Sequence, residues 1–203
     1  MIAAGELMKN FESLGDNCEF GILQRRCGVE PLGLLRWATS EIVPLIQALG
    51  ARFDGFGDAA NIEIHTGANG EYTFIDRKFG FRSHTFIKAS SISAEAMHAQ
   101  ECRRQSFLRD KMIDTLESGQ RIFVYKKATL PPLHAIREIH EGLQRYGRNR
   151  LLWVTLADAR NAAGTLELVT EGLLRGYIDH FSPYENVPSD ISVQCWTTIC
   201  RIA

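Results

Sequence analysis

The chain lacks an excess of either charge, because 23 Lys and Arg residues stand against 24 Asp and Glu residues. A protein that binds nucleic acid usually gathers basic residues on one face, and here they are scattered along the sequence. The chain also lacks any apolar run near the roughly 18 residues that a membrane-spanning helix needs. We therefore expect neither nucleic acid nor a membrane as a partner.

Paired cysteines are missing as well, since none of the five cysteines belongs to a CxxC pair. Residues 1–8 have neither the basic start nor the apolar run of an export signal. Cysteines in such a chain are expected to be reduced thiols, which favours a cytoplasmic location.

Several motifs that are typical of catalytic, nucleotide-binding or metal-binding sites are absent: GxSxG, a Walker loop, GxGxxG, HExxH and zinc-finger spacing. We accordingly expect no metal and no cofactor. The sequence does not specify an oligomeric state.

What is present is the patterning of one α/β domain, which we place at residues 11–203 after an N-terminal arm at 1–10. A strand at 121–126, a helix from Pro132 and a strand at 151–156 form a βαβ unit, whose strands are expected to be parallel. Strands at 62–65 and 71–76 flank a short loop and predict a hairpin. The expected fold is therefore α/β, with a partly parallel sheet, flanking helices and a β-hairpin insertion. Further strands are expected at 11–15, 84–87, 166–170 and 173–178, and helices at 40–50, 94–117 and 193–203.

Cys18 follows the first strand, in a segment that reads as strand, turn and helix. Asp16 fits the N-cap of that helix, with Glu19 as its capping-box partner. Cys18 would then lie in the first turn, where free N–H groups and the helix dipole favour a thiolate. Asn17 and a neighbouring N–H could hold an oxyanion. The acidic neighbours oppose ionisation of the thiol, and a cysteine is often simply a packing residue.

The parallel strands should carry other polar residues to the same edge of the sheet as Cys18. Lys126 and Lys127 end the strand at 121–126, and Asp158 follows the strand at 151–156. Arg36 and Trp37 could line a substrate cleft, or the tryptophan could anchor the edge of the core while the arginine reaches water.

Three segments resemble an uncharacterised bacterial family described as papain-like cysteine peptidases. They are Ser13-Leu-Gly-Asp-Asn-Cys18, Glu30-Pro-Leu-Gly-Leu-Leu-Arg-Trp37 and Arg82-Ser-His84-Thr85. More loosely, the resemblance covers nearly the whole chain. It implies Cys18 as nucleophile and His84 as base, while Asp158 and Asp76 both remain candidates for a third, orienting residue. The chain departs from the family at Arg36 and at Thr85, where an acidic residue is usual.

Two functions compete. The first is a cysteine-dependent hydrolase or acyl transferase acting on a small-molecule or peptide substrate, with Asn17, Arg36, Trp37 and Lys126 around the substrate. The second is a non-catalytic module that recognises a glycan, nucleotide or phosphate at the sheet edge, with Arg36, Lys126 or Lys127 as clamps. A purely structural domain would instead show a flat apolar surface.

Overall fold

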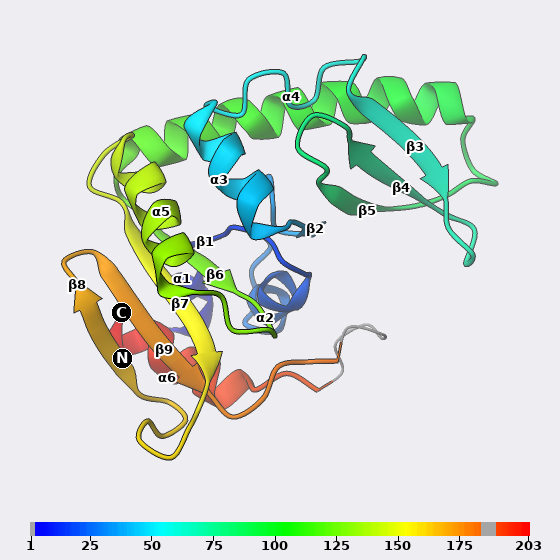
Figure 1. Cartoon of the computed structure of the whole chain (residues 1–203). Helices are drawn as coiled ribbons and strands as arrows, with labels where there is room; N and C mark the ends of the chain where they lie inside the picture. Colours follow the sequence, from blue (N-terminus) through cyan, green and yellow to red (C-terminus); the bar gives the residue numbers. More distant parts are fainter. Residues whose placement is uncertain (1–2, 184–189) are drawn as a thin grey trace.

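Two sheets organise the computed structural model, which describes residues 3–183 and 190–203 (Figure 1). A five-stranded sheet has the order β1-β6-β7-β9-β8, and a four-stranded antiparallel sheet has the order β2-β5-β4-β3. The strands are β1 (Phe11–Ser13), β2 (Ala38–Thr39), β3 (Ile62–Thr66), β4 (Glu71–Asp76), β5 (Arg82–Lys88), β6 (Ile122–Lys126), β7 (Arg150–Leu156), β8 (Leu166–Thr170) and β9 (Leu173–Ile178). The helices are α1 (Ala4–Met8), α2 (Glu19–Arg26), α3 (Ile42–Gly50), α4 (Ala94–Ser118), α5 (Leu133–Gln144) and α6 (Val193–Ile202).

The five-stranded sheet is mostly parallel, as the sequence predicts. Strands β1, β6, β7 and β9 pair in parallel, and α5 connects β6 to β7 in the expected βαβ unit. Only β8 runs antiparallel, as the outer strand of its hairpin with β9. The carboxyl ends of β1, β6 and β7 therefore lie at one edge of the sheet, which is the edge where ligands bind in many α/β proteins.

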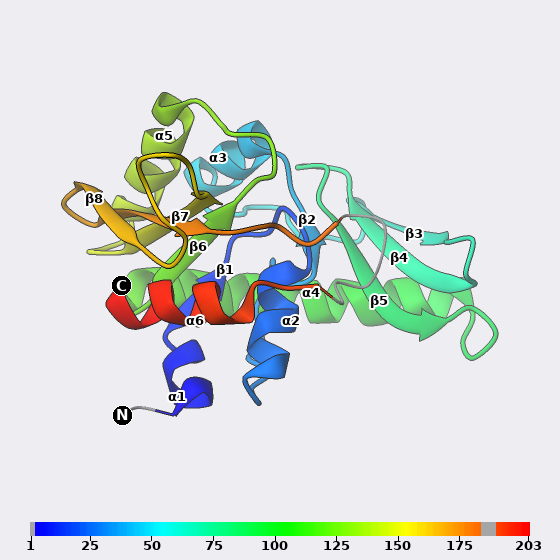
Figure 2. The same ribbon diagram turned by 90° about the horizontal axis from the view of Figure 1, so that it is seen from below.

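Helices cover both faces of this sheet (Figure 2). Helices α3 and α5 pack on one face, while α1, α2 and α6 lie on the other, where Phe20, Trp196 and Ile199 fill the core. The long helix α4 runs past both sheets (Figure 1). The core beneath α3 and α5 continues from Phe123 in the five-stranded sheet to Phe74 in the four-stranded sheet. The two sheets thus share one hydrophobic core.

Two short elements were not expected from the sequence. Within the proposed N-terminal arm, Ala4–Met8 form α1, whose Leu7 and Met8 are buried and which contacts α6. Ala38–Thr39 form β2, which pairs with Ser83 and Arg82 of β5. Elements of two to five residues are too short to show a periodic pattern of apolar residues.

In the part of the chain that the structure describes, no helix combines the length and the apolar character needed to cross a membrane.

Candidate functional site

The chain leaves β1 through a turn that presents Cys18. Gly15 and Asp16 have φ angles of +92° and +81° in this turn. A Cβ atom at Gly15 would lie 2.6 Å from Ser40 Oγ, so both the backbone angle and the available space require glycine. Cys18, rather than Asp16, is the N-cap of α2, and Asn17 Oδ1 accepts the Glu19 N–H at 2.9 Å. The predicted Asp16–Glu19 capping box is therefore wrong, although the predicted helix start after β1 is present.

Asp16 and Glu19 are instead buried and pair with the lysine that ends β6. Lys126 Nζ lies 2.9 Å from Glu19 Oε2 and 3.5 Å from Asp16 Oδ2. All three side chains are at most 2% exposed. Trp196 Nε1 donates to the other Glu19 oxygen at 3.0 Å. Buried charges require such partners, so Lys126 fixes the start of α2. The sequence suggested that Lys126 lies around a substrate, but its side chain is buried.

Lys127 and Arg36, the other cations expected to clamp a ligand, are also paired. Lys127 Nζ lies 2.7 Å from Glu41 Oε2. The Arg36 side chain is 5% exposed, donates to the Gly21 carbonyl at 2.9 Å and pairs with Glu30 at 3.3 Å. Arg36 thus fixes the loop after α2, and its guanidinium is buried there instead of lining an open cleft as the sequence suggested.

The thiol of Cys18 is half-buried at the start of α2. Its Sγ donates to the Trp37 carbonyl at 3.7 Å. Burial raises the pKa of Cys18 to about 11, with the Lys126 charge lowering it and the Glu71 carboxylate raising it. The expected stabilisation of a thiolate by the helix terminus is outweighed, and the resting thiol is neutral at pH 7.

His84 lies on β5 and is held by a carboxylate on the neighbouring strand. His84 Nδ1 is 3.0 Å from Glu71 Oε1, and the same oxygen accepts the backbone N–H of Phe86 at 3.1 Å. The pairing of β4 with β5 is irregular here, and Phe86 has a φ angle of +61°. Such bulges re-aim side chains and are common beside active sites. The irregularity brings the His84 ring and the Phe86 amide to one carboxylate.

Aromatic rings connect this pair to Trp37, whose backbone carbonyl accepts from Cys18. The Trp37 and Phe86 ring centroids are 5.3 Å apart, and those of Phe86 and His84 are 5.8 Å apart. Ser83 Oγ donates at 3.0 Å to the same Trp37 carbonyl that accepts from Cys18. No hydrogen bond joins Cys18 directly to His84 in the described residues. The structure therefore gathers Cys18, Trp37, His84, Phe86 and Glu71 into one group, which we name the Cys18 cluster.

Neither aspartate considered for the orienting role contacts His84. Asp158 is exposed, and its Oδ1 accepts the backbone N–H groups of Arg160 and Asn161 at 2.8 and 2.9 Å. These bonds lower the pKa of Asp158 and fix its own loop. Asp76 is buried and accepts the Phe79 N–H at 2.9 Å in the turn between β4 and β5. Glu71, and not Asp158 or Asp76, is the carboxylate that contacts His84.

The start of α2 also offers two donors next to Cys18. The backbone N–H of Cys18 and the Nδ2 amide of Asn17 have no hydrogen-bond partner in residues 3–183 and 190–203. Both belong to the same turn as the thiol. They are suited to stabilise negative charge on an oxygen bound beside Sγ, as the sequence suggested for Asn17.

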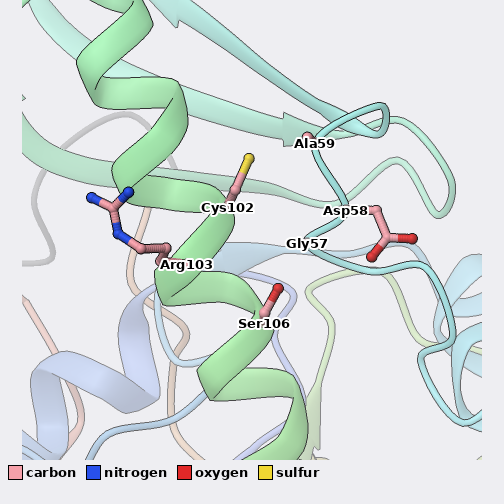
Figure 3. Close-up of a pocket in the computed structure, with 6 residues that line it drawn as sticks. All are labelled: Gly57, Asp58, Ala59, Cys102, Arg103 and Ser106. Carbon is pink, nitrogen blue, oxygen red and sulfur yellow. The ribbon is translucent and has the colours of Figure 1, made fainter.

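A second cysteine lies at an open pocket of about 540 Å³ between α4 and the loop at residues 57–59 (Figure 3). Cys102, Arg103 and Ser106 line it from α4. The Cys102 Sγ lies 3.8 Å from both ring nitrogens of His98, whose Nε2 is 3.1 Å from two backbone carbonyls. An equal distance to both nitrogens is a poor geometry for proton transfer, and none of the predicted site residues lines this pocket. Cys102 therefore provides a matched control for Cys18.

Nowhere in the described ranges do three or more His, Cys, Asp or Glu side chains gather in a way that could hold a metal ion. Comparisons of the chain with models of protein families, with curated proteins and with solved structures gave no match.

Proposed function

We propose that the protein is a cysteine-dependent hydrolase or acyl transferase in which Cys18 is the nucleophile and His84 the general base. The observation that carries this proposal is the His84–Glu71 pair, held by a strained bulge beside the thiol at the start of α2. A nucleophile, a base and an acid that orients the base form the usual set for acyl transfer. The resemblance to papain-like cysteine peptidases supports the same two residues, and Glu71 supplies the acid.

The raised pKa of Cys18 determines how the thiol would act. When Nδ1–H of His84 donates to Glu71, Nε2 is left as an acceptor. This nitrogen takes the thiol proton while Sγ attacks the carbonyl carbon of the substrate. Glu71 stabilises the resulting imidazolium, and the Cys18 N–H and Asn17 Nδ2 stabilise the oxyanion.

Collapse of the tetrahedral intermediate completes the transfer. The bond to the leaving alcohol or amine breaks, and the leaving group takes the proton from His84. The acyl group remains on Sγ as a thioester. Water or another acceptor then attacks the thioester, gives its proton to His84 and releases Cys18 as a thiol.

In the non-catalytic alternative, three cations would clamp an anionic ligand, but these side chains are already paired within the chain. Arg36, Lys126 and Lys127 each pair with a carboxylate, and Arg36 and Lys126 are buried. This arrangement favours the catalytic proposal over recognition of a phosphate or nucleotide by these cations.

The test is turnover of a panel of activated acyl esters and short peptide amides by purified wild-type protein and four variants. We expect Cys18→Ala to abolish turnover and His84→Asn to lower kcat/KM by about 100-fold or more, the range for loss of a general base. Glu71→Gln should lower kcat about tenfold, since it removes the charge that stabilises the imidazolium but keeps the side-chain volume.

Cys102→Ala is the matched control and should retain wild-type turnover. A covalent acyl adduct found by mass spectrometry on the peptide containing Cys18 would support the proposal. Turnover that survives Cys18→Ala, or that disappears with Cys102→Ala in a folded protein, would overturn it.

A further inference from the structure

A second pocket, of about 460 Å³, opens on the face of the five-stranded sheet next to the start of α5. It is lined by residues 130–133, by Trp153 of β7, by Arg175 of β9, and by Glu167 and Val169 of β8. None of these residues belongs to the Cys18 cluster. The volume lies in the range of small-molecule sites.

Arg175 is the one guanidinium of this pocket and is held in place without a carboxylate partner in the described residues. Its Cζ lies 4.5 Å from the centre of the Trp153 ring and 5.0 Å from that of Tyr177. Its Nε donates to Thr155 Oγ1 at 3.2 Å, so the two terminal nitrogens carry the remaining donors. A stacked arginine with its end groups open is pre-organised to bind a planar anion.

Two further groups at the pocket have donors without a hydrogen-bond partner in the described residues. Trp153 is only 3% exposed, and its buried Nε1 has no hydrogen-bond partner in the described part of the chain, which is rare for a buried donor. Helix α5 begins behind Pro132 with no side-chain cap and no acidic residue in its first turn. The N–H groups of Leu133 and His134 are likewise without a partner there. The first residues of this twelve-residue helix thus line the pocket, and no acidic side chain in the first turn offsets the helix dipole.

The donors at this pocket are the terminal nitrogens of Arg175, Nε1 of Trp153 and the first backbone N–H groups of α5. From them we propose that this pocket binds a carboxylate carried on an apolar group. The carboxylate pairs with Arg175, near the start of α5 and the Trp153 indole. The apolar group packs on Leu130, Pro131 and Val169, which line the same pocket. Glu167 also lines the pocket, and its carboxylate accepts the Tyr177 hydroxyl. A phosphate dianion fits less well than a carboxylate, because only one cation among the described residues of the pocket pairs with it and the Glu167 charge repels a dianion about twice as strongly as a monoanion.

Two sources carry this chemistry: a free carboxylic acid and the carboxyl terminus of a peptide. Titrations with hexanoate and with N-acetyl-leucyl-leucine distinguish them, and hexanamide and N-acetyl-leucyl-leucinamide are the uncharged controls. Binding is followed by calorimetry and by tryptophan fluorescence, with Trp153→Phe to assign the signal. We expect at least one carboxylate to bind about tenfold or more tightly than its amide. The tighter of the two carboxylates identifies the source.

Arg175→Met keeps the aliphatic stem that stacks on Trp153 but removes the charge, and should weaken carboxylate binding about tenfold or more. Arg137→Met, on the exposed surface of α5, is the matched control and should bind as the wild type does. Equal binding of amide and carboxylate by the wild-type protein would overturn the proposal, even if Arg175→Met failed to fold. Inorganic phosphate that binds as tightly as the carboxylates, or no binding of either carboxylate at millimolar concentration, would also overturn it.

Discussion

Cys18 combines a helix N-terminus with a half-buried position, and the two act on its thiol in opposite directions. The helix dipole and Lys126 favour the thiolate, whereas burial and the Glu71 carboxylate favour the neutral thiol. Burial is the largest of these effects and raises the pKa to about 11. Unlike cysteines that exist as thiolates at rest, Cys18 would therefore need a base to react at neutral pH, which is the role proposed for His84.

This balance predicts how alkylation of Cys18 depends on pH. Because its pKa is raised, the reactive thiolate forms only as the pH rises towards 11. From the fraction of thiolate at pH 7.5, iodoacetamide should label Cys18 about 300-fold more slowly than a free thiol of pKa about 8.5. Glu71→Gln removes a charge that raises this pKa and should speed labelling, while it slows turnover. Peptide mapping by mass spectrometry gives the rate at each cysteine. An apparent pKa below 8 for Cys18 would contradict the environment described above.

Among single residues, the sequence singled out Cys18 and His84, which the structure places in one cluster, but not Glu71, which contacts His84. Cys18 follows a recognisable strand and turn, and His84 lies in a segment with a family resemblance. Glu71 was missed because its contact with His84 depends on an irregular strand pairing, which no local pattern records. Lys126 was misplaced because its position at the end of a strand does not reveal that two carboxylates bury it.

At the scale of elements, the irregular pairing of β4 with β5 is what assembles the His84–Glu71 pair. The sequence predicted both strands, and the hairpin that β4 forms with β3. It did not predict that Phe86 adopts a φ angle of +61°, which is costly for a side chain of this size. Phe86 is also 54% exposed, so its ring adds little to the core. Strain of this kind is often found at functional sites.

The strain at Phe86 can be measured with a pair of variants that both remove the ring. Phe86→Gly tolerates the positive φ angle, whereas Phe86→Ala keeps the penalty of a Cβ atom. We expect the glycine variant to have a free energy of unfolding about 0.5–1 kcal/mol above that of the alanine variant, in urea titrations. A glycine variant less stable than the alanine variant would show that Phe86 is not strained.

At the scale of the whole molecule, the four-stranded sheet is joined to the five-stranded sheet by a shared core. Phe81 of the loop before β5 is fully buried, packs 5.8 Å from the Phe56 ring and belongs to the same cluster as Phe123 of β6. The sequence predicted the hairpin as an insertion but not its packing, because contacts between distant segments leave no mark in local periodicity. The Cys18 cluster lies across this junction, since Cys18 follows β1 and His84 belongs to β5. Its geometry therefore depends on the two sheets folding as one unit.

Phe81→Ala tests this dependence. Loss of a buried phenylalanine should lower the free energy of unfolding by about 3–5 kcal/mol. If the sheets form one cooperative unit, amide hydrogens of β4 and of β7 should lose protection by the same free energy, as native-state hydrogen exchange would show. Phe107→Ala, an exposed position on α4, is the control and should change neither. Protection lost in β4 but kept in β7 would instead mean that the four-stranded sheet unfolds by itself. His84 could then leave Cys18 while the parallel sheet stays intact.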